Sequence, residues 1–342
     1  MKHILPIFIL TIFLANCKKE DLKTTPALYN TDHTENWMQD LIAEFPNSNF
    51  SFKDISIPRA HDAGMYEANN CFGGNECNTV TQERDMLSML ESGVRMFDVR
   101  PILKEDVYWT YHATGCNQFG CEGDLLIDLL EQTNTFLENH NELVILELSH
   151  FCNTSASDAG LLDILNNVFG DKIYKENTPL DTAFIYTPLK ELIPPSNSSG
   201  KVVLKMDGLS PATENRAEGY FGHHLMPTSG NFSDMPVLDN MKADQLNKFN
   251  DFPEDSPNLY RLSWTLTQDN ALAIFCIQDA ENDPTSILDL AYDARDDLSN
   301  TIDSWIASGT IHKGKIPNII SVDVANTVVA EECNRLSKLN IE

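Results

Sequence analysis

The sequence contains few basic residues for its length. Lys and Arg together number 24 against 51 Asp and Glu, which gives a formal net charge of −27. The chain has no block of Lys or Arg and no basic helix, so it lacks a surface that could release counterions from nucleic acid. Nucleic-acid binding is therefore excluded, and strong electrostatic attraction to an anionic membrane is disfavoured.

Several catalytic motifs are also absent. The chain has no G-x-S-x-G, no H-E-x-x-H, no P-loop and no G-x-G-x-x-G after an expected strand. Its 8 cysteines include no C-x-x-C pair, the close spacing typical of zinc ligands. These absences argue against serine-hydrolase, zinc-protease, nucleotide and dinucleotide chemistry. A hydrophobic content of 42% nevertheless supplies enough apolar material for a globular core.

The N-terminal segment has the pattern of an export signal. One Lys is followed by an uncharged apolar run, Ile4–Ala15, which is shorter than the roughly 20 residues of a membrane-spanning helix. Cys17 follows at once, and the segment resembles the lipobox of bacterial lipoproteins; a plain secretory signal is the alternative. We expect a lipoprotein signal peptide at residues 1–16, a flexible tether at 17–35, and an exported bacterial protein anchored in the cell surface or outer membrane through lipidated Cys17.

Short β-branched or aromatic runs recur along the rest of the chain, separated by amphipathic helical stretches. This alternation predicts a parallel sheet, and the number of strand candidates favours a closed barrel. The strand candidates are residues 52–58, 93–101, 107–114, 142–150, 201–208, 261–268, 271–279 and 316–325, and the helical stretches are 81–91, 125–138, 159–169 and 286–307.

We therefore expect residues 36–342 to form one α/β domain with a distorted, TIM-barrel-like (β/α)8 fold, and we expect a monomer. Residues 210–255, rich in Gly, Pro, Asn and acidic residues, are predicted to form a long loop with one short helix near Lys242.

The cysteines beyond Cys17 suggest local cross-links. Cys71 and Cys77 enclose a short Gly-containing segment, as do Cys116 and Cys121, so disulfides within each pair are expected in an exported protein. The other three lie in or beside apolar runs, where buried free thiols are the commoner state. These are Cys152, Cys276 and Cys333.

Histidines and charged residues stand at the ends of three predicted strands. His61 and Asp62 follow the first strand, Asp98 and Arg100 share one face of the second by the two-residue period, and His112 ends the third. Catalytic groups gather at the carboxyl ends of barrel strands, where all three strands would place them. Each signal alone is more often structural than catalytic.

Taken together and in order, these motifs resemble the X-domain core of phosphatidylinositol-specific phospholipase C, in the Ca-independent bacterial form and the related short X-domain-only proteins. The similarity spans about residues 36–335. The matching segments are residues 57–64, Thr81-Gln82, 93–100, His112, 263–268, 277–279 and 317–323.

The resemblance implies cleavage of phosphatidylinositol, or of a related inositol or GPI glycolipid, by a neighbouring hydroxyl, giving a cyclic inositol phosphate and diacylglycerol. It implies that His61 is the base and His112 the acid. Asp323 would hold the base, while Asp62 and Asp98 would lie near the acid and the phosphate. The remaining catalytic group would be Arg100, which would neutralise the phosphate oxygens in place of Ca²⁺.

Because Arg100 would take the place of Ca²⁺, we expect the reaction to need no metal and no other cofactor. Glu147 and Asp207 are the carboxylates that could still hold a metal.

The headgroup pocket departs from the family pattern. Bacterial relatives place basic residues where this chain has Ser149 and Met206 or Asp207; Lys205 could substitute in part. Asp279 resembles an inositol-hydroxyl contact. We therefore expect substrate binding by Lys205, Asp279 and Ser149. Arg59 stands in place of the usual Gly, either as a phosphate contact or pointing to solvent, with solvent slightly favoured. Two other functions remain open: a non-catalytic surface binding module on the same fold, and a metal-dependent glycerophosphodiester hydrolase.

Overall fold

A computed structural model describes residues 34–176, 183–193, 199–278 and 284–342. The chain divides into two units, Met1–Asp32 and His33–Glu342, and all the described residues belong to the second. The expected signal peptide and Cys17 lie outside the described residues, as does Asp279. None of the described helices is long and apolar enough to cross a lipid bilayer.

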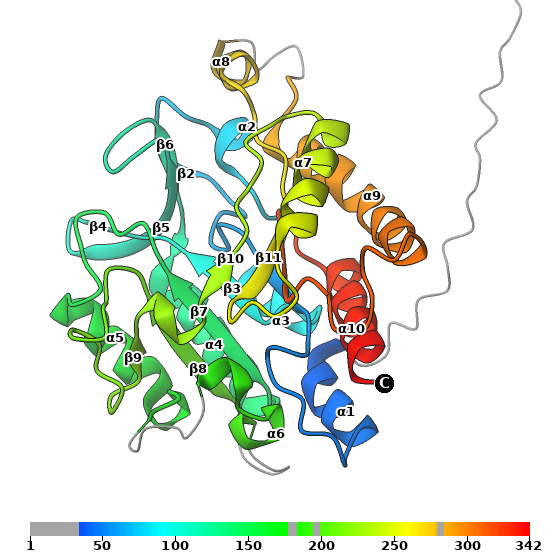
Figure 1. Ribbon diagram of the computed structural model, residues 1–342. Coiled ribbons are helices and arrows are strands. Elements are labelled where there is room, and N and C mark those ends of the chain that lie inside the picture. The colour runs from blue at the N-terminus through cyan, green and yellow to red at the C-terminus, as the bar shows by residue number, and fades with distance from the viewer. Residues whose placement is uncertain (1–33, 177–182, 194–198, 279–283) are drawn as a thin grey trace, which may run out of the picture. The chain divides into compact units, whose positions relative to one another are not determined.

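Within the described residues, a curled 8-stranded sheet forms the centre of the domain, with neighbouring strands parallel throughout (Figure 1). Strands β9 and β10 are its two edges. The architecture is the expected TIM-barrel-like α/β fold, here with an opening between these edges. In spatial order the strands are β10 (Thr228–Ser229), β11 (Leu259–Trp264), β12 (Ile319–Val322), β1 (Ile57–Ala60), β3 (Met96–Val99), β7 (Leu143–Leu148), β8 (Lys201–Met206) and β9 (Tyr220–Phe221).

Alternation along the strands explains how the site is built. Every second residue of a strand faces the surrounding helices and belongs to the larger apolar cluster, as Leu146 and Leu204 do. The residues between them point into the barrel, where Ile57, Ile145 and Val203 form part of a second apolar cluster. Two residues further along each of these strands the inward positions become polar. The barrel is thus closed by apolar side chains at its amino end and lined by charged ones towards its carboxyl end.

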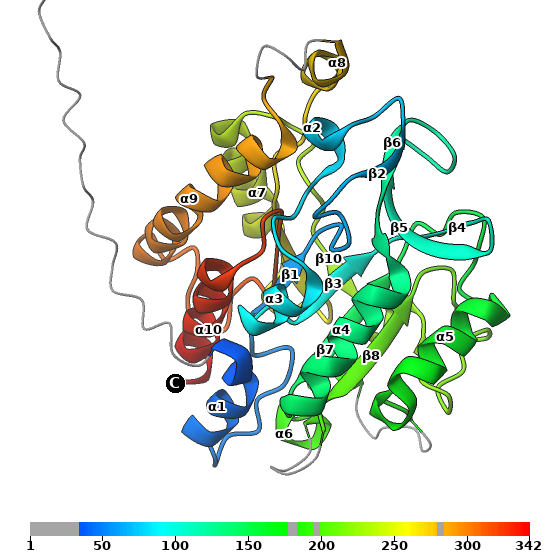
Figure 2. The same ribbon diagram turned by 180° about the vertical axis from the view of Figure 1, so that it is seen from behind.

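Helices cover the outside of this sheet (Figures 1 and 2). Three of the four helices expected from apolar spacing are confirmed, and the fourth, expected at 81–91, begins only at Met86. Local capping side chains explain two of the starts: Asp158 accepts from the Leu161 amide, and Ser286 forms a capping box with Asp289. The helices are α1 (Trp37–Glu44), α2 (Glu76–Thr79), α3 (Met86–Glu91), α4 (Leu126–Asn139), α5 (Ala159–Phe169), α6 (Leu189–Leu192), α7 (Leu238–Asp251), α8 (Asn270–Gln278), α9 (Ile287–Ala307) and α10 (Thr327–Ile341).

A second, four-stranded antiparallel sheet adjoins the carboxyl end of the barrel. It contains β2 (Asn69–Phe72), β6 (Gly120–Leu125), β5 (Val107–Ala113) and β4 (Pro101–Lys104), in that order. The expectation that residues 107–114 form a barrel strand is therefore wrong. Strands β4 and β5 are joined through Glu105 and Asp106, both with positive φ (50° and 64°), which makes a tight hairpin and reverses the chain.

Two other segment predictions are also corrected. The prediction of a strand at 271–279 is wrong, because Asn270–Gln278 is helix α8, which Asp269 starts by accepting from the amides of Ala271 and Leu272 at 2.9 Å each. The segment 210–255, expected as a loop with one short helix, supplies β9, β10 and the 14-residue helix α7. The barrel has eight strands, as expected, but β9 and β10 take the place of the segments 107–114 and 271–279.

The expected local disulfides are wrong as well. The cross-links join Cys71 to Cys121, Cys77 to Cys276, and Cys116 to Cys152. Each pair is brought together by tertiary neighbours: β2 with β6 in the first, and α2 with α8 in the second. In the third, Cys152 lies beside Ile102 of β4. Cys333 is a buried free thiol, as expected.

Candidate active site

The base candidate lies where two neighbouring strands end. Ala60 of β1 is in register with Val322 of β12, so His61 and Asp323 leave the sheet side by side. His61 Nδ1 lies 2.8 Å from Asp323 Oδ1, and its Nε2 lies 2.8 Å from Nη2 of Arg100. Because the carboxylate can only accept and the guanidinium can only donate, the proton belongs on Nδ1 and the lone pair on Nε2. This is the tautomer that a general base needs.

Two carboxylates control the protonation of this ring. Burial lowers the pKa of His61, but the negative charges of Asp62 and Asp323 outweigh it, so the pKa is raised above its ordinary 6.5. Further hydrogen bonds fix the backbone of this turn: Gln82 Nε2 donates to the His61 carbonyl at 2.6 Å, and Thr81 Oγ1 donates to the Asp62 carbonyl at 3.0 Å.

The acid candidate reaches the same place from the second sheet. His112 lies on β5, and its Nδ1 is 2.9 Å from Asp62 Oδ2. The same oxygen lies 3.7 Å from Nε2 of His61, so one buried carboxylate stands beside both imidazoles. Burial raises the pKa of Asp62, and the nearby Arg100 and both histidines more than reverse this, leaving a lowered pKa.

Arg100 connects these groups. It follows β3, pairs through Nε with Asp62 Oδ1, and donates from Nη2 to Asp98 Oδ2 at 3.0 Å. Burial alone would raise the pKa of Asp98, but Arg100 and Arg59 hold it well below its usual range. Ser149 donates from Oγ to the other Asp98 oxygen at 2.8 Å. The guanidinium is therefore held on two sides by buried carboxylates.

Below this centre lies a second buried charge cluster. Arg59 donates from Nε and Nη2 to Glu147 Oε2, at 2.9 and 2.6 Å, and from Nη1 to Ser321 Oγ at 2.8 Å. Lys205 pairs with the other oxygen of Glu147. Burial opposes ionisation of Glu147, yet Arg59 and Lys205 lower its pKa to about 2. The slight preference for Arg59 in solvent is wrong, since the side chain is buried and ion-paired.

These residues surround a cavity of about 970 Å³. His61, His112, Asp98, Arg100 and Asp323 line it together. Ser149 also lines the cavity, whereas Lys205 is not among its lining residues and is occupied by Glu147. The rim of the cavity includes the exposed apolar side chains of Phe119, Phe232, Ile274 and Ile277.

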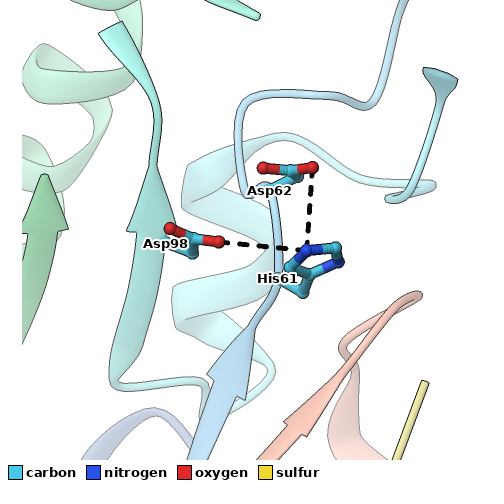
Figure 3. A group of neighbouring side chains, drawn as sticks. All are labelled: His61, Asp62 and Asp98. Carbon is cyan, nitrogen blue, oxygen red and sulfur yellow. Dashed lines mark ion pairs between the residues drawn. The ribbon is translucent and has the colours of Figure 1, made fainter. Parts of the chain in front are cut away.

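Three of these donors could also approach a metal ion. One ligand atom each from His61, Asp62 and Asp98 lies within 4.8 Å of the others. Figure 3 shows the two carboxylates pointing towards the imidazole of His61. Arg100 already contacts both carboxylates, however, and supplies the positive charge that an ion would bring. These three groups are therefore close enough to bind a metal ion, but Arg100 already neutralises the negative charge that would attract one.

Sequence reasoning missed a charged residue of the cavity wall. Arg261 of β11 lines the cavity with Ser263 and Thr265, at the two-residue spacing of one strand face. The arginine at the start of the predicted strand 261–268 was the available signal.

Comparison with known proteins agrees with this geometry. Residues 55–207 match the family model for the X domain of phosphatidylinositol-specific phospholipase C, which confirms the resemblance inferred from the motifs.

The fold is shared with solved bacterial structures. Phosphatidylinositol-specific phospholipase C from Listeria monocytogenes is similar at a TM-score of 0.59 and 16% identity, covering 89% of this chain and 98% of that one. A pentafluoro-Phe-containing phosphatidylinositol-specific phospholipase C from Staphylococcus aureus is similar at a TM-score of 0.57 and 17% identity, covering 88% and 97%. No curated protein matches the chain.

Proposed function

We propose that the protein is a phosphodiesterase that cleaves phosphatidylinositol, or a related inositol or GPI glycolipid, to a cyclic inositol phosphate and diacylglycerol. The observation that carries the proposal is the pair of imidazoles, His61 and His112, which meet at the single carboxylate of Asp62 beside Arg100. The X-domain match over residues 55–207 supports the same reaction class.

The reaction is an internal displacement at phosphorus. His61 Nε2 takes the proton of the ring hydroxyl next to the phosphodiester, which replaces Arg100 as the donor to that nitrogen. The hydroxyl oxygen forms the new bond to phosphorus as the bond to the glycerol oxygen breaks. His112, held by Asp62, gives a proton to that leaving oxygen. Each such proton transfer contributes roughly 10²- to 10⁴-fold to the rate.

Arg100 faces the charge that grows on the non-bridging phosphate oxygens. Burial lowers the pKa of its guanidinium, but Asp62 and Asp98 raise that pKa by more, so the group remains ionised at every relevant pH. A positive charge held in advance by buried carboxylates needs little reorganisation during the reaction, and such stabilisation is usually the largest catalytic contribution. Catalysis without a metal cofactor follows from this assignment.

The rim of the cavity favours a lipid substrate. Helix α8 lies at the cavity mouth and contains no charged residue, in a chain of net charge −27. Ile274, Phe275 and Ile277 on it are 50–56% exposed, and Phe232 nearby in the lining is 58% exposed. Burial of each such side chain stabilises contact with acyl chains by about 1.5–3 kcal/mol at most. Apolar contact would thus replace the electrostatic attraction that the acidic chain lacks.

The location is part of the proposal. The three disulfides among the described residues are typical of an oxidising, extracytoplasmic compartment, which supports export. We assign residues 1–16 to the signal peptide, 17–35 to the tether and Cys17 to the lipid anchor. Mass spectrometry of the mature N-terminus tests this: a lipid adduct on Cys17 is expected, and an unmodified Cys17 within an intact chain contradicts it.

The decisive experiment is a phosphorus NMR assay of the purified protein on phosphatidylinositol and on a GPI-linked reporter, with and without EDTA. The expected product is a five-membered cyclic phosphate, formed equally in both conditions. A linear phosphate as the first product would instead indicate direct attack by water, and loss of activity in EDTA would refute the role of Arg100. His61→Ala should abolish turnover, and an unchanged rate would refute His61 as the base. A wild type that binds the lipid without cleaving it, with the same binding in His61→Ala, would instead indicate a binding module.

A further inference from the structure

The two imidazoles of the candidate site are carried by different sheets. His61 follows β1, whose neighbours in the parallel barrel are β12 and β3. His112 lies on β5 of the antiparallel sheet, directly opposite Cys121 of β6. The 2.9 Å contact from His112 to Asp62, the residue after His61, therefore crosses from one sheet to the other. Its geometry depends on what fixes the second sheet to the barrel.

The apolar contact at this junction is small. Among the residues that the structure describes, the cluster formed there has three buried members, Ile102, Tyr111 and Cys152. Trp109 and Ala113 pack against it and are only partly buried. The two clusters of the barrel are far larger. Burial of so few side chains stabilises a single arrangement of the two sheets only weakly.

Two disulfides add covalent attachment close to His112. Cys116, in the loop between β5 and β6, is bonded to Cys152, which follows barrel strand β7. Cys121, the residue opposite His112, is bonded to Cys71 of β2. The first cross-link joins the β5–β6 hairpin to the barrel, and the second joins β6 to β2 at the level of the imidazole.

Hydrogen bonds reinforce the same junction. Cys152 makes two backbone hydrogen bonds to β4, both of 3.0 Å. The side chains of Asn117 and Asn153, beside the disulfide, exchange hydrogen bonds of 2.9 and 3.2 Å. Tyr111, which precedes the acid candidate, donates from its hydroxyl to the carbonyl of His150 at 2.5 Å. The segment after β7 is thus bound to β4, to β5 and to the β5–β6 loop.

Resting on the proposed function, we infer that the Cys116–Cys152 and Cys71–Cys121 disulfides are positioning elements of catalysis, which hold His112 within reach of the leaving oxygen. A displacement of about 1 Å at a reacting group costs about 10²-fold in rate. Proton abstraction from the ring hydroxyl uses His61, whereas departure of the alkoxide uses His112. A looser second sheet should therefore impair proton donation and spare proton abstraction.

The third disulfide of the described residues is the matched control. Cys77–Cys276 joins α2 to α8 and includes no residue of the β5–β6 hairpin. It links positions 199 residues apart, against 36 and 50 for the other two. Because stabilisation by a cross-link grows with the length of the loop that it closes, removal of Cys77–Cys276 should destabilise the fold most.

The experiment measures kcat for two water-soluble inositol phosphodiesters, one with an alkyl alcohol and one with p-nitrophenol as the leaving group. Nitrophenolate departs without a proton, so only the alkyl ester needs a general acid. Thermal unfolding of each variant reports its stability. The variants are two without a hairpin disulfide, the control without the third, and one without the acid: Cys116→Ser/Cys152→Ser, Cys71→Ser/Cys121→Ser, Cys77→Ser/Cys276→Ser and His112→Ala.

We expect each hairpin variant to lose roughly tenfold or more of its kcat on the alkyl ester and to keep most of its rate on the nitrophenyl ester. His112→Ala should show the same pattern with a larger loss. The control variant should have the lowest melting temperature, yet any loss of rate should be alike on both esters. A merely structural role of the disulfides would not give this selectivity for the leaving group.

Equal losses on both esters in the hairpin variants, or the same selective loss in the control, would overturn the inference. If the hairpin variants do not fold, Asn117→Gly replaces them. It keeps the disulfide and tolerates the left-handed backbone (φ 57°) but removes the paired hydrogen bonds at the junction. A smaller selective loss is expected, and an unchanged ratio of the two rates would overturn the inference.

The same measurements separate failure of this inference from failure of the proposed function. A selective loss in His112→Ala alone leaves the proposed function intact and removes only the role of the disulfides. Equal loss on both esters in His112→Ala contradicts His112 as the acid. Cleavage of neither ester by the wild type contradicts the proposed function itself.

Discussion

Asp62 is the residue on which the geometry of the site converges. It has a left-handed backbone (φ 45°), is buried, and contacts Arg100 and His112 directly. This conformation, uncommon outside Gly, Asn and Asp, turns the carboxylate back towards the rings of His61 and His112. The two histidines therefore meet at one turn, although they come from different sheets.

Asp323→Asn should change the pH profile as well as the rate. Burial lowers the pKa of His61, whereas Asp62 and Asp323 raise it, so removal of the Asp323 charge lowers that pKa. The base is active only when neutral, and activity falls as the pH drops through the pKa, which in the wild type lies above 6.5. The acid limb of kcat/KM should thus move to lower pH, while the maximum falls by roughly a hundredfold or more because the tautomer is no longer fixed.

The control for this variant is Asp303→Asn on α9, whose carboxylate pairs with Arg335 away from the cavity. It should leave both limb and maximum unchanged. An acid limb that stays in place in Asp323→Asn would show that His61 is not the titrating base.

Arg100→Met is expected to lower kcat by about 10²- to 10³-fold, the usual cost of removing one preorganised donor to a developing oxyanion. It also leaves Asp62 and Asp98 without their shared partner, so Arg100→Lys, which keeps the charge, is measured beside it. The lysine should recover only part of the loss because it cannot span two carboxylates and the phosphate. Full activity in Arg100→Lys, with a normal melting temperature, would contradict the assignment.

Substitutions on helix α8 allow binding to a lipid surface to be tested separately from catalysis. It projects beside α2 (Figures 1 and 2), and its residues Ile274 and Ile277 line the cavity. The Cys77–Cys276 disulfide fixes it to α2, and the Asn75 side chain donates to the Cys276 carbonyl at 2.7 Å. The position of the apolar side chains of α8 is therefore fixed by a disulfide and a hydrogen bond.

Phe275→Ser should weaken binding to neutral phosphatidylcholine vesicles and slow cleavage of lipid presented in them. Phe275 is exposed and does not line the cavity, so cleavage of a water-soluble inositol phosphodiester should remain unchanged. The matched control is Val237→Ser, an exposed apolar residue that also lies outside the cavity lining. Vesicle sedimentation measures binding, and equal losses in both variants would refute a specific role for α8.

The incorrect secondary-structure predictions also concern individual elements. Residues 271–279 form a short apolar run, which periodicity alone cannot divide between strand and helix; the capping side chain of Asp269 decides for helix. Residues 107–114 do form a strand, but its partners are antiparallel neighbours in the second sheet. Strands β9 and β10 have two residues each and no pattern of their own, so only pairing with β8 and β11 defines them.

At the scale of the whole molecule, the disulfides and the large negative charge have opposite effects on the stability of the folded state. The three cross-links of the described residues join positions 36, 50 and 199 residues apart, and each such closure stabilises by about 2–4 kcal/mol, mainly through the unfolded chain. A net charge of −27 opposes this through self-repulsion. Stability should therefore depend strongly on redox state and on salt.

Reduction of the disulfides should lower the melting temperature by several degrees or more, and added salt should recover part of that loss by screening the acidic groups. Differential scanning calorimetry with and without dithiothreitol, each at low and high salt, measures both effects. The Cys333→Ser variant is the control, because this thiol is free. A melting temperature that is indifferent to reduction would contradict a stabilising role for the cross-links.

The amino-acid sequence by itself determined the fold class, most of the extent of four helices and the types of residue at the candidate site, because local periodicity and strand-end motifs are properties of short segments. It assigned His61, Asp98, Arg100, His112 and Asp323 to one site through their order along the chain. Tertiary structure alone decided the disulfide partners and the sheet that carries His112. These depend on which distant segments become neighbours, and that is settled by packing over the whole barrel.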